Sequence, residues 1–246
     1  MCSRADPGTS GNGRTPILAA MVGTVAGLAG CALGYSVGSI PVGLWLGHAV
    51  RGLDVREHGS GSTGATNVSR VLGPAAGAAT FLLDVGKGAV AVEGARALGA
   101  GPRGRAAAGL AAVVGHAWPA YAHFRGGKSV ATAFGALLML SPPGAASAVA
   151  GGMTALLATQ TVSVGSLAAA GSATAGTAAA WAFAAGEGTG DRARRSRAAA
   201  FGFTAAATGI ILYRHSANLR RLVRGDEPRL PLWGRSRARS RSVTNP

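Results

Sequence analysis

The chain has 246 residues, of which 48% are hydrophobic and only 13% are charged, against about 25% charged in an average soluble domain. Its formal net charge of +15 comes largely from arginines near the C-terminus. Long uncharged runs of glycine and alanine exclude an ordinary soluble domain and predict a membrane protein whose helices approach each other through small residues.

The N-terminal segment, residues 1–16, is polar and precedes a long apolar run. That run is longer than the core of a signal peptide, so no cleavable signal is expected. The two cysteines, Cys2 and Cys31, form no disulfide framework. Since no histidines, cysteines and carboxylates have metal-ligand spacing, we expect neither a metal nor a cofactor.

Seven apolar runs follow, and they predict an all-α, polytopic membrane domain over residues 17–213. The runs are separated by polar or proline-containing breaks, and the fourth is the shortest: 17–50, 71–98, 106–121, 129–140, 144–160, 162–185 and 198–213. Residues 187–197 are expected to form a charged loop. Residues 214–228 are expected to continue the last helix into water, and residues 229–246 to form a basic tail facing the lipid surface. No folded module that presents bases is evident, so nucleic acid is not an expected partner.

An odd number of spans places the two ends of the chain on opposite sides of the cell membrane. With the C-terminus in the cytoplasm, fourteen basic residues lie inside and nine outside, in line with the usual bias of basic residues toward the cytoplasm. The arginines of 192–197 fall on the outer side and oppose this bias. The topology brings residues 51–70, 122–128, 161–166 and 214–227 to one face, so we expect a loop-built site on the cytoplasmic face of the inner membrane.

In the first polar segment, residues 52–73, Gly59, Gly61 and Gly64 alternate with hydroxyl and amide side chains. Successive glycines allow backbone N–H groups to point into one concavity, which binds anions. The phosphate-binding candidates are Gly59, Ser60, Gly61, Thr66, Asn67 and Arg70. A flexible glycine and serine linker is the alternative, but a linker needs no asparagine and arginine at its margin.

The second polar segment contains Gly126, Gly127 and Lys128, which resemble the end of a phosphate-binding P-loop. Position 122 is alanine rather than the required glycine, so a nucleotide hydrolase is excluded. Two glycines and a compact cation still suit phosphate. His116 lies in the preceding apolar run and is either a general base or a hydrogen-bonded structural residue.

Three further groups carry polar side chains. Asp84 and Lys87 lie three residues apart within a span, which favours a buried ion pair over direct catalysis. Ser163 and Ser166 supply hydroxyls at the start of the sixth run. His215 and Asn218 are also three residues apart, on one face of the expected helix after the last span.

Taken together, these residues resemble the PlsY family, the acyl-phosphate-dependent glycerol-3-phosphate acyltransferases of bacteria. The resemblance covers about residues 34–228 and also includes Gly38, Ser39, Pro41, Asp54, Arg56, Gly64, Gly115, Phe124, Arg214, Arg221, Gly225 and Glu227. The chain departs from the family at two positions, with Ser62 where the family usually has asparagine and Ser129 where it has glycine.

The resemblance implies seven membrane helices and transfer of a fatty acyl group from acyl phosphate to the sn-1 hydroxyl of glycerol 3-phosphate. The products would be lysophosphatidic acid and phosphate, in phospholipid biosynthesis. By resemblance, Arg70, Lys128, His215 and Asn218 would bind glycerol 3-phosphate. The residues expected to hold acyl phosphate are Gly59, Ser60, Gly61, Thr66, Asn67 and Ser163, with Gly126, Gly127 and Ser166 as further substrate-binding residues.

Two phosphate-bearing substrates, one with a long chain, call for two anion pockets beside a lipid-accessible groove. Acyl phosphate is already activated, so a covalent acyl-enzyme is not required. The resemblance implies that the departing phosphate takes the hydroxyl proton, with His116 or His215 as alternative bases. A membrane transporter or binding protein for a phosphorylated solute is the competing function, although no internal repeat is evident. The sequence does not predict the oligomeric state.

Overall fold

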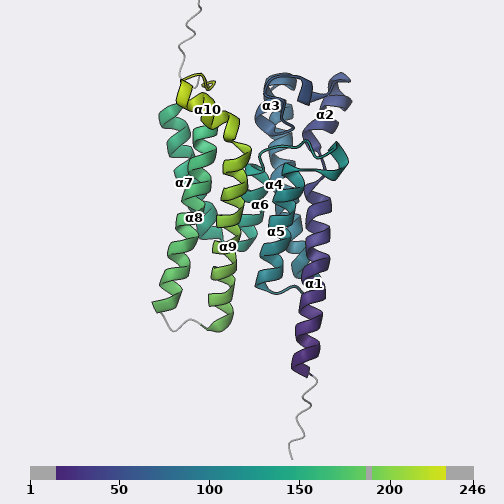
Figure 1. Ribbon diagram of the computed structural model, residues 1–246, viewed down its shortest axis with the longest axis vertical. Coiled ribbons are helices and arrows are strands. Elements are labelled where there is room, and N and C mark those ends of the chain that lie inside the picture. Colours follow the sequence, from purple (N-terminus) through teal and green to yellow (C-terminus); the bar gives the residue numbers. More distant parts are fainter. Residues whose placement is uncertain (1–14, 187–189, 231–246) are drawn as a thin grey trace, which may run out of the picture.

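The computed structural model describes residues 15–186 and 190–230, which form a helical bundle with no β-strand in these ranges (Figure 1). The elements in chain order are α1 (Thr15–Gly38), α2 (Val42–Arg51), η1 (Val55–Glu57), α3 (Ala65–Leu72), α4 (Pro74–Ala97), α5 (Pro102–Ala117), η2 (Ala120–Ala122), α6 (Val130–Leu140), α7 (Pro142–Thr159), α8 (Val162–Gly186), α9 (Asp191–Arg214) and α10 (Ser216–Arg224). Each predicted apolar run overlaps one of the seven helices α1 and α4–α9. The all-α prediction is therefore confirmed.

In the described chain, two helical segments are long and apolar enough to cross a membrane by length and composition alone: Ala20–Arg51 and Pro74–Ala97. The shortest bundle helix is α6, as predicted. Its eleven residues rise about 16 Å, against roughly 30 Å for the hydrocarbon layer. The N-terminus of α6 consequently lies at a loop that reaches into the bundle.

Two sequence expectations at the end of the chain were wrong. Residues 190–197 do not continue the expected charged loop, because α9 already begins at Asp191. Arginine and alanine are good helix formers, and an aspartate in the first turn complements the helix dipole. The last helix also does not continue through residues 214–228: it ends at Arg214, and α10 is a separate helix that starts at Ser216. The third run likewise begins earlier than expected, at Pro102, which is well suited to the first turn of a helix.

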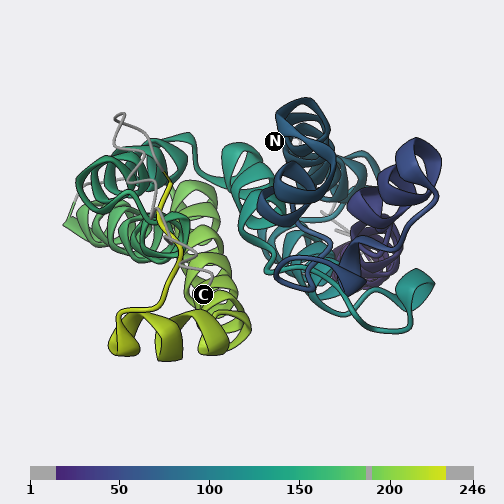
Figure 2. The same cartoon turned by 90° about the horizontal axis from the view of Figure 1, so that it is seen from above.

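Small residues set the spacing between the helices. A side chain at Gly34 of α1 would collide with the carbonyl of Ala108 on α5, and one at Gly88 of α4 with the carbonyl of Thr132 on α6. Such close backbone contact is typical of membrane helices, where packing rather than the hydrophobic effect drives association. Viewed from above, the bundle has two parts, α1–α5 in purple to blue-green and α7–α10 in green to yellow, with α6 between them (Figure 2).

The seven helices α1 and α4–α9 alternate in direction, so successive connections lie at opposite ends of the bundle (Figure 1). The short helices α2, α3 and α10 lie at one end of the bundle. The start of α1, the end of α8 and the start of α9 lie at the other. The four polar segments predicted to share a face therefore meet at one end. Residues 1–14 and 231–246, which make up most of the predicted terminal tails, lie outside the described ranges.

Candidate active site

A polar cavity of about 260 Å³ opens at this end of the bundle, and all four polar segments contribute to its wall. Ten of the residues predicted for the site line it: Ser60, Thr66, Asn67, Arg70, His116, Lys128, Ser163, Ser166, His215 and Asn218. The four predicted glycines, Gly59, Gly61, Gly126 and Gly127, do not line it but shape the two loops beside it. The two expected anion pockets therefore share one continuous cavity in the described part of the chain.

Asn67 organises the first loop from within. Its side-chain oxygen accepts a hydrogen bond from the Ser60 N–H at 2.7 Å. Its amide nitrogen lies within hydrogen-bonding distance of the carbonyls of Val55, His58 and Ser62, at 2.8, 3.1 and 2.8 Å. The buried amide is thus occupied by the loop. It fixes the shape of the loop, while Thr66 and Arg70 on α3 remain exposed beside it.

Positive φ angles make this loop fold back on itself. Gly59 has φ 62°, and a side chain at this position would meet the Asn67 carbonyl oxygen. Gly61 has φ 68°. L-residues with a side chain rarely adopt such angles, so the glycines are needed for the turn that brings the Ser60 N–H to the Asn67 side chain. The prediction of a shaped loop here, rather than a linker, agrees with this geometry.

A clamp joins the first loop to the second. The guanidinium of Arg56 donates to both carboxylate oxygens of Asp54, at 2.7–3.0 Å, and to the carbonyl of Ala122 at 2.9 Å. Hydrogen bonds from Arg56 hold the pKa of Asp54 below its ordinary value. Asp54 and Arg56 are half-buried, and their hydrogen bonds hold the two loops together.

The second loop carries Lys128 into the cavity wall. Burial lowers the pKa of this amine to about 8, although nearby Glu227 raises it, and Arg221, Arg70 and Arg214 lower it further. Lys128 lines the cavity together with Arg70 and Arg221, and the carboxylates of Glu227 and Asp84 line it as well. A concentration of positive charge in a partly desolvated cavity favours a multiply charged anion such as a phosphate monoester.

His215 is buried at the junction of α9 and α10. Its Nδ1 lies 2.8 Å from the carbonyl of Ile211, which can only accept, so Nδ1 carries the hydrogen and Nε2 has the free lone pair. Burial lowers the pKa of His215 to about 4, despite the opposing effect of this hydrogen bond. The imidazole is accordingly neutral at physiological pH.

Glu227 was absent from the predicted site residues, although it lines the cavity. It accepts hydrogen bonds from Asn218 at 2.6 Å and from Arg221 at 2.7 Å. Burial raises the pKa of Glu227, but these hydrogen bonds outweigh it and leave the pKa below its ordinary value. The sequence signal for this residue was a single glutamate close to several arginines after the last helix.

His116 lies beside the buried ion pair of Asp84 and Lys87, in line with the structural role. Its Nδ1 lies 3.4 Å from the Asp84 carboxylate, which in turn lies 2.8 Å from the Lys87 amine. Lys87 also donates to the carbonyl of Ile40, at the break between α1 and α2. The predicted Asp84–Lys87 ion pair is confirmed, and it secures this break as well as orienting His116.

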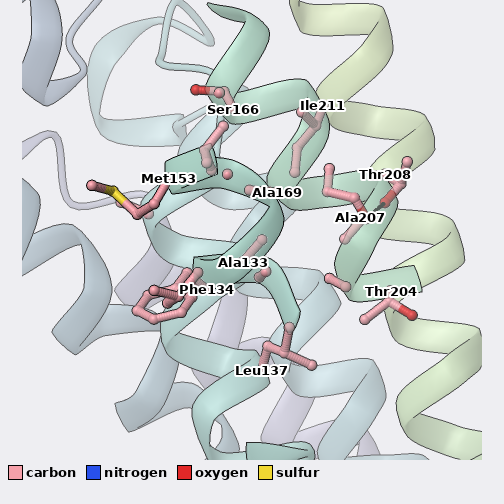
Figure 3. Close-up of a pocket in the computed structure, with 18 of the residues that line it drawn as sticks. Ala133, Phe134, Leu137, Met153, Ser166, Ala169, Thr204, Ala207, Thr208 and Ile211 are labelled. Atoms are coloured by element: carbon pink, nitrogen blue, oxygen red, sulfur yellow. Dashed lines mark hydrogen bonds between the residues drawn. The ribbon is translucent and has the colours of Figure 1, made fainter. Parts of the chain in front are cut away.

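An apolar groove of about 250 Å³ lies next to the polar cavity, and Figure 3 shows residues that line it. Phe81, Val130, Ala131, Val162 and Ser166 border both spaces. Ser166 and Ile211 lie toward the polar end of the groove, and Leu137 lies deep (Figure 3). Phe81 was also missed by the sequence analysis, and its position one helical turn before Asp84 was the signal.

The outer rim of the groove is exposed, and its deep end is closed. Phe81, Val149 and Met153 are 44%, 49% and 46% exposed, whereas Leu137 and Phe203 are both 3% exposed. In a membrane the exposed rim faces hydrocarbon. The arrangement provides one polar compartment for anions and one apolar compartment open to lipid.

The chain matches known proteins over most of its length. The family sequence profile described as glycerol-3-phosphate acyltransferase matches residues 28–225. A glycerol-3-phosphate acyltransferase from Symbiobacterium thermophilum is 41% identical over 207 residues, covering 84% of this chain and 96% of that protein. One from Anaeromyxobacter sp. is 45% identical over 217 residues, covering 85% of this chain and 99% of that protein.

A solved structure has the same architecture. The crystal structure of PlsY (YgiH), an integral membrane glycerol 3-phosphate acyltransferase, in its glycerol 3-phosphate form, superimposes with a TM-score of 0.69 at 32% identity. The match covers 83% of this chain and 95% of that one. The lysophosphatidic acid form of that protein matches equally well, at 31% identity. The chain therefore belongs to the glycerol-3-phosphate acyltransferase family and is an integral membrane acyltransferase.

Proposed function

We propose that this enzyme uses acyl phosphate as the donor and transfers its acyl group to the sn-1 hydroxyl of glycerol 3-phosphate. The observation that carries the proposal is that the cationic cavity and the lipid-facing groove are neighbours that share five lining residues. Acyl phosphate has a phosphate for the cavity and a hydrocarbon chain for the groove. Relatives crystallised in glycerol 3-phosphate and lysophosphatidic acid forms support the acceptor and the product.

Roles for the cavity residues follow from their placement. Arg70, Lys128, His215 and Asn218 bind glycerol 3-phosphate. The loop of Gly59, Ser60 and Gly61, with Thr66 and Ser163, holds the phosphate of the donor, and Asn67 maintains the shape of that loop. Gly126 and Gly127 position Lys128, and Ser166 stands where the phosphate end of the donor meets its hydrocarbon end.

The reaction needs no covalent enzyme intermediate. The sn-1 oxygen attacks the acyl carbonyl carbon, a new C–O ester bond forms, and the bond between that carbon and the phosphate oxygen breaks. The hydroxyl proton goes to the departing phosphate, which leaves as hydrogenphosphate. His215, with a pKa of about 4, is a weak base, which favours proton transfer to phosphate and leaves its Nε2 to orient the hydroxyl. Charge neutralisation and positioning then supply most of the rate.

Purified enzyme with palmitoyl phosphate and glycerol 3-phosphate tests the donor. Equal amounts of phosphate and lysophosphatidic acid are expected, and no product with palmitoyl-CoA or palmitoyl-acyl carrier protein. Use of the thioesters would overturn the donor assignment. Binding of glycerol 3-phosphate without turnover of any donor would favour the transporter or binding-protein alternative.

Arg70→Ala tests the assignment of the cavity residues. We expect kcat/KM for glycerol 3-phosphate to fall at least tenfold, about 1.4 kcal/mol of lost transition-state binding. Arg224→Ala, on the exposed face of α10, removes the same charge outside the cavity and should behave as wild type. A change below about threefold in Arg70→Ala would contradict its role.

We further propose that the active-site end faces the cytoplasm, in line with the distribution of basic residues. Cys2 and Cys31 are replaced by serine, and single cysteines are introduced as Arg224→Cys at the active-site end or Arg103→Cys at the opposite end. In intact cells, a membrane-impermeant maleimide should label only the Arg103→Cys protein. The reverse labelling pattern would overturn the orientation.

A further inference from the structure

The side chain of Arg214 forms a fork over the loop that carries Lys128. Its Nε donates to the carbonyl of Gly127 and its Nη2 to the carbonyl of Gly126, both at 3.0 Å. The Gly127 carbonyl belongs to the peptide bond that joins Gly127 to Lys128. A planar guanidinium that holds two successive carbonyls fixes both the position and the orientation of that peptide.

The guanidinium itself is held in place. Its central carbon lies 5.6 Å from the ring centroid of Trp118, at the start of the same loop. Trp118 also packs against Tyr213, with ring centroids 6.1 Å apart. Two consecutive α9 residues, Tyr213 and Arg214, therefore contact both ends of the loop. Cation–π and ring contacts of this kind restrict a long side chain to one position.

The opposite side of the loop rests on His116. The N–H of Gly127 donates to the His116 carbonyl at 3.0 Å, and a side chain at Gly127 would collide with the imidazole. The two glycines thus lie between His116 and Arg214 with no space for side chains. Within residues 15–186 and 190–230, no hydrogen bond or ion pair holds the Lys128 amine itself, so its position depends on this backbone.

Residue 214 also directly precedes His215, the buried cavity residue at the end of α9. Lys128 lies in the loop between η2 and α6, and His215 lies between α9 and α10. We propose that Arg214 is a positioning residue that fixes Lys128 relative to His215, so that both contact the same acceptor molecule. This inference rests on the proposed function, because it assumes that glycerol 3-phosphate binds between these two groups.

Two substitutions separate the geometry of Arg214 from its charge. Arg214→Lys keeps the charge but loses the fork, and Arg214→Gln loses both. In each, KM for glycerol 3-phosphate should rise at least tenfold, while KM for palmitoyl phosphate changes less than threefold. Arg220→Gln is the matched control, because Arg220 is an exposed α10 residue whose side chain reaches only its own helix, and it should behave as wild type. Wild-type KM for glycerol 3-phosphate in Arg214→Lys would overturn the proposal.

The pH profile provides a readout that a purely structural role would not change. Arg214, Arg70, Arg221 and Glu227 are the charged groups that act on Lys128. Removing the cation of Arg214 should move the alkaline limb of kcat/KM to higher pH in Arg214→Gln but not in Arg214→Lys. An unmoved limb in Arg214→Gln would overturn the placement of this guanidinium beside Lys128.

Hydrogen exchange tests the loop without any substrate. Amides of residues 124–129 should exchange at least tenfold faster in both Arg214 variants than in wild type, with α4 and α5 unchanged. This result is expected even if acyl phosphate is not the donor, so failure of the inference and failure of the proposed function remain distinguishable. Unchanged exchange in the loop would overturn the inference.

If neither variant folds, Trp118→Leu removes the ring beneath the guanidinium and keeps every charge. A KM increase of at least threefold supports the proposal, and wild-type KM overturns it.

Discussion

At the scale of single residues, Ser129 shows how this chain accommodates a departure from its family. It has φ 63°, a left-handed conformation that costs an L-residue roughly 1–2 kcal/mol. Its hydroxyl donates to the Val113 carbonyl at 2.7 Å, which is worth about 1 kcal/mol. The hydrogen bond offsets much of the strain, so serine is tolerated where glycine is usual.

Substitutions at Ser129 should therefore have opposite outcomes. Ser129→Gly relieves the strain and loses the hydrogen bond, so stability should change by less than about 1 kcal/mol and kcat by less than threefold. Ser129→Val places a β-branched residue at positive φ and should destabilise by about 2 kcal/mol or more. Thermal unfolding in detergent measures both, with Ser196→Val in the helical backbone of α9 as the control. Equal stability of the glycine and valine variants would refute the argument.

The lowered pKa of Lys128 gives a second prediction at this scale. The ammonium is present below pH 8 and is lost as the pH rises through about 8. KM for glycerol 3-phosphate should be flat near neutrality and rise up to tenfold per pH unit above 8. Bound phosphate stabilises the charged amine, so the limb in kcat lies at higher pH than the limb in kcat/KM. Steady-state kinetics from pH 6.5 to 10 measures both limbs.

Lys128→Arg supplies the control, because a guanidinium stays charged throughout this range. The variant should lose the alkaline limb even if its activity is lower. Since the pKa of His215 is about 4, no loss of activity from its protonation is expected between pH 7 and 5.5. An alkaline limb retained in Lys128→Arg would assign the titration to another group.

At the scale of elements, the site depends on two loops being tied together. Arg56→Gln removes the link from the first loop to Ala122 and should lower kcat/KM by roughly 10- to 100-fold, the usual effect of a 1 Å displacement. Stability should fall by about 1 kcal/mol or less, since the Asp54–Arg56 pair is partly exposed. Arg51→Gln, which loses an exposed bond to the Val71 carbonyl, is the control.

The sign of the pH effect of this pair follows from Asp54. Its pKa in the folded protein is lowered by Arg56, so its contribution to stability is present above the unfolded pKa of about 3.9. The contribution is lost as the pH falls through the lower, folded pKa. Between pH 6 and 8 the stability difference between Arg56→Gln and wild type should therefore be constant. A difference that varies across that range would show that Asp54 is not the titrating partner.

The helices could be predicted from the sequence because apolar runs of sufficient length have few alternatives to a spanning helix. Their alternation then brought Arg70, Lys128 and Asn218 to one end before any contact was known. The hydrogen bonds that shape the loops could not be predicted in this way. The four contacts of the Asn67 side chain, and the fork of Arg214, depend on segments that meet only in the folded bundle. The start of α9 was missed because its first turns are charged, which masks a helix when apolar content is the criterion.

At the scale of the whole molecule, two compartments with opposite polarity meet where the two parts of the bundle join. The polar cavity is lined by loop residues together with residues of α3, α4, α8 and α10, and the apolar groove mainly by α6, α7, α8 and α9. Neither compartment exists within one segment of the chain. We therefore expect the reaction centre at their border, near Ser166, where the proposed donor would keep its phosphate in one compartment and its hydrocarbon in the other.

The groove makes a prediction about donors of different length. Ala133 of α6 is buried and lines the groove about one helical turn below Val130, at the border with the polar cavity. Ala133→Leu adds three carbons there, so kcat/KM for palmitoyl phosphate should fall at least tenfold. Acetyl phosphate, whose chain ends before this depth, should be used as slowly by the variant as by wild type. Ala175→Leu makes the same change on an exposed position of α8 outside the groove and should leave both donors unaffected. Equal loss with both donors would mean that the substitution disturbs the bundle rather than the path of the chain, because overpacking a membrane core acts on every substrate alike.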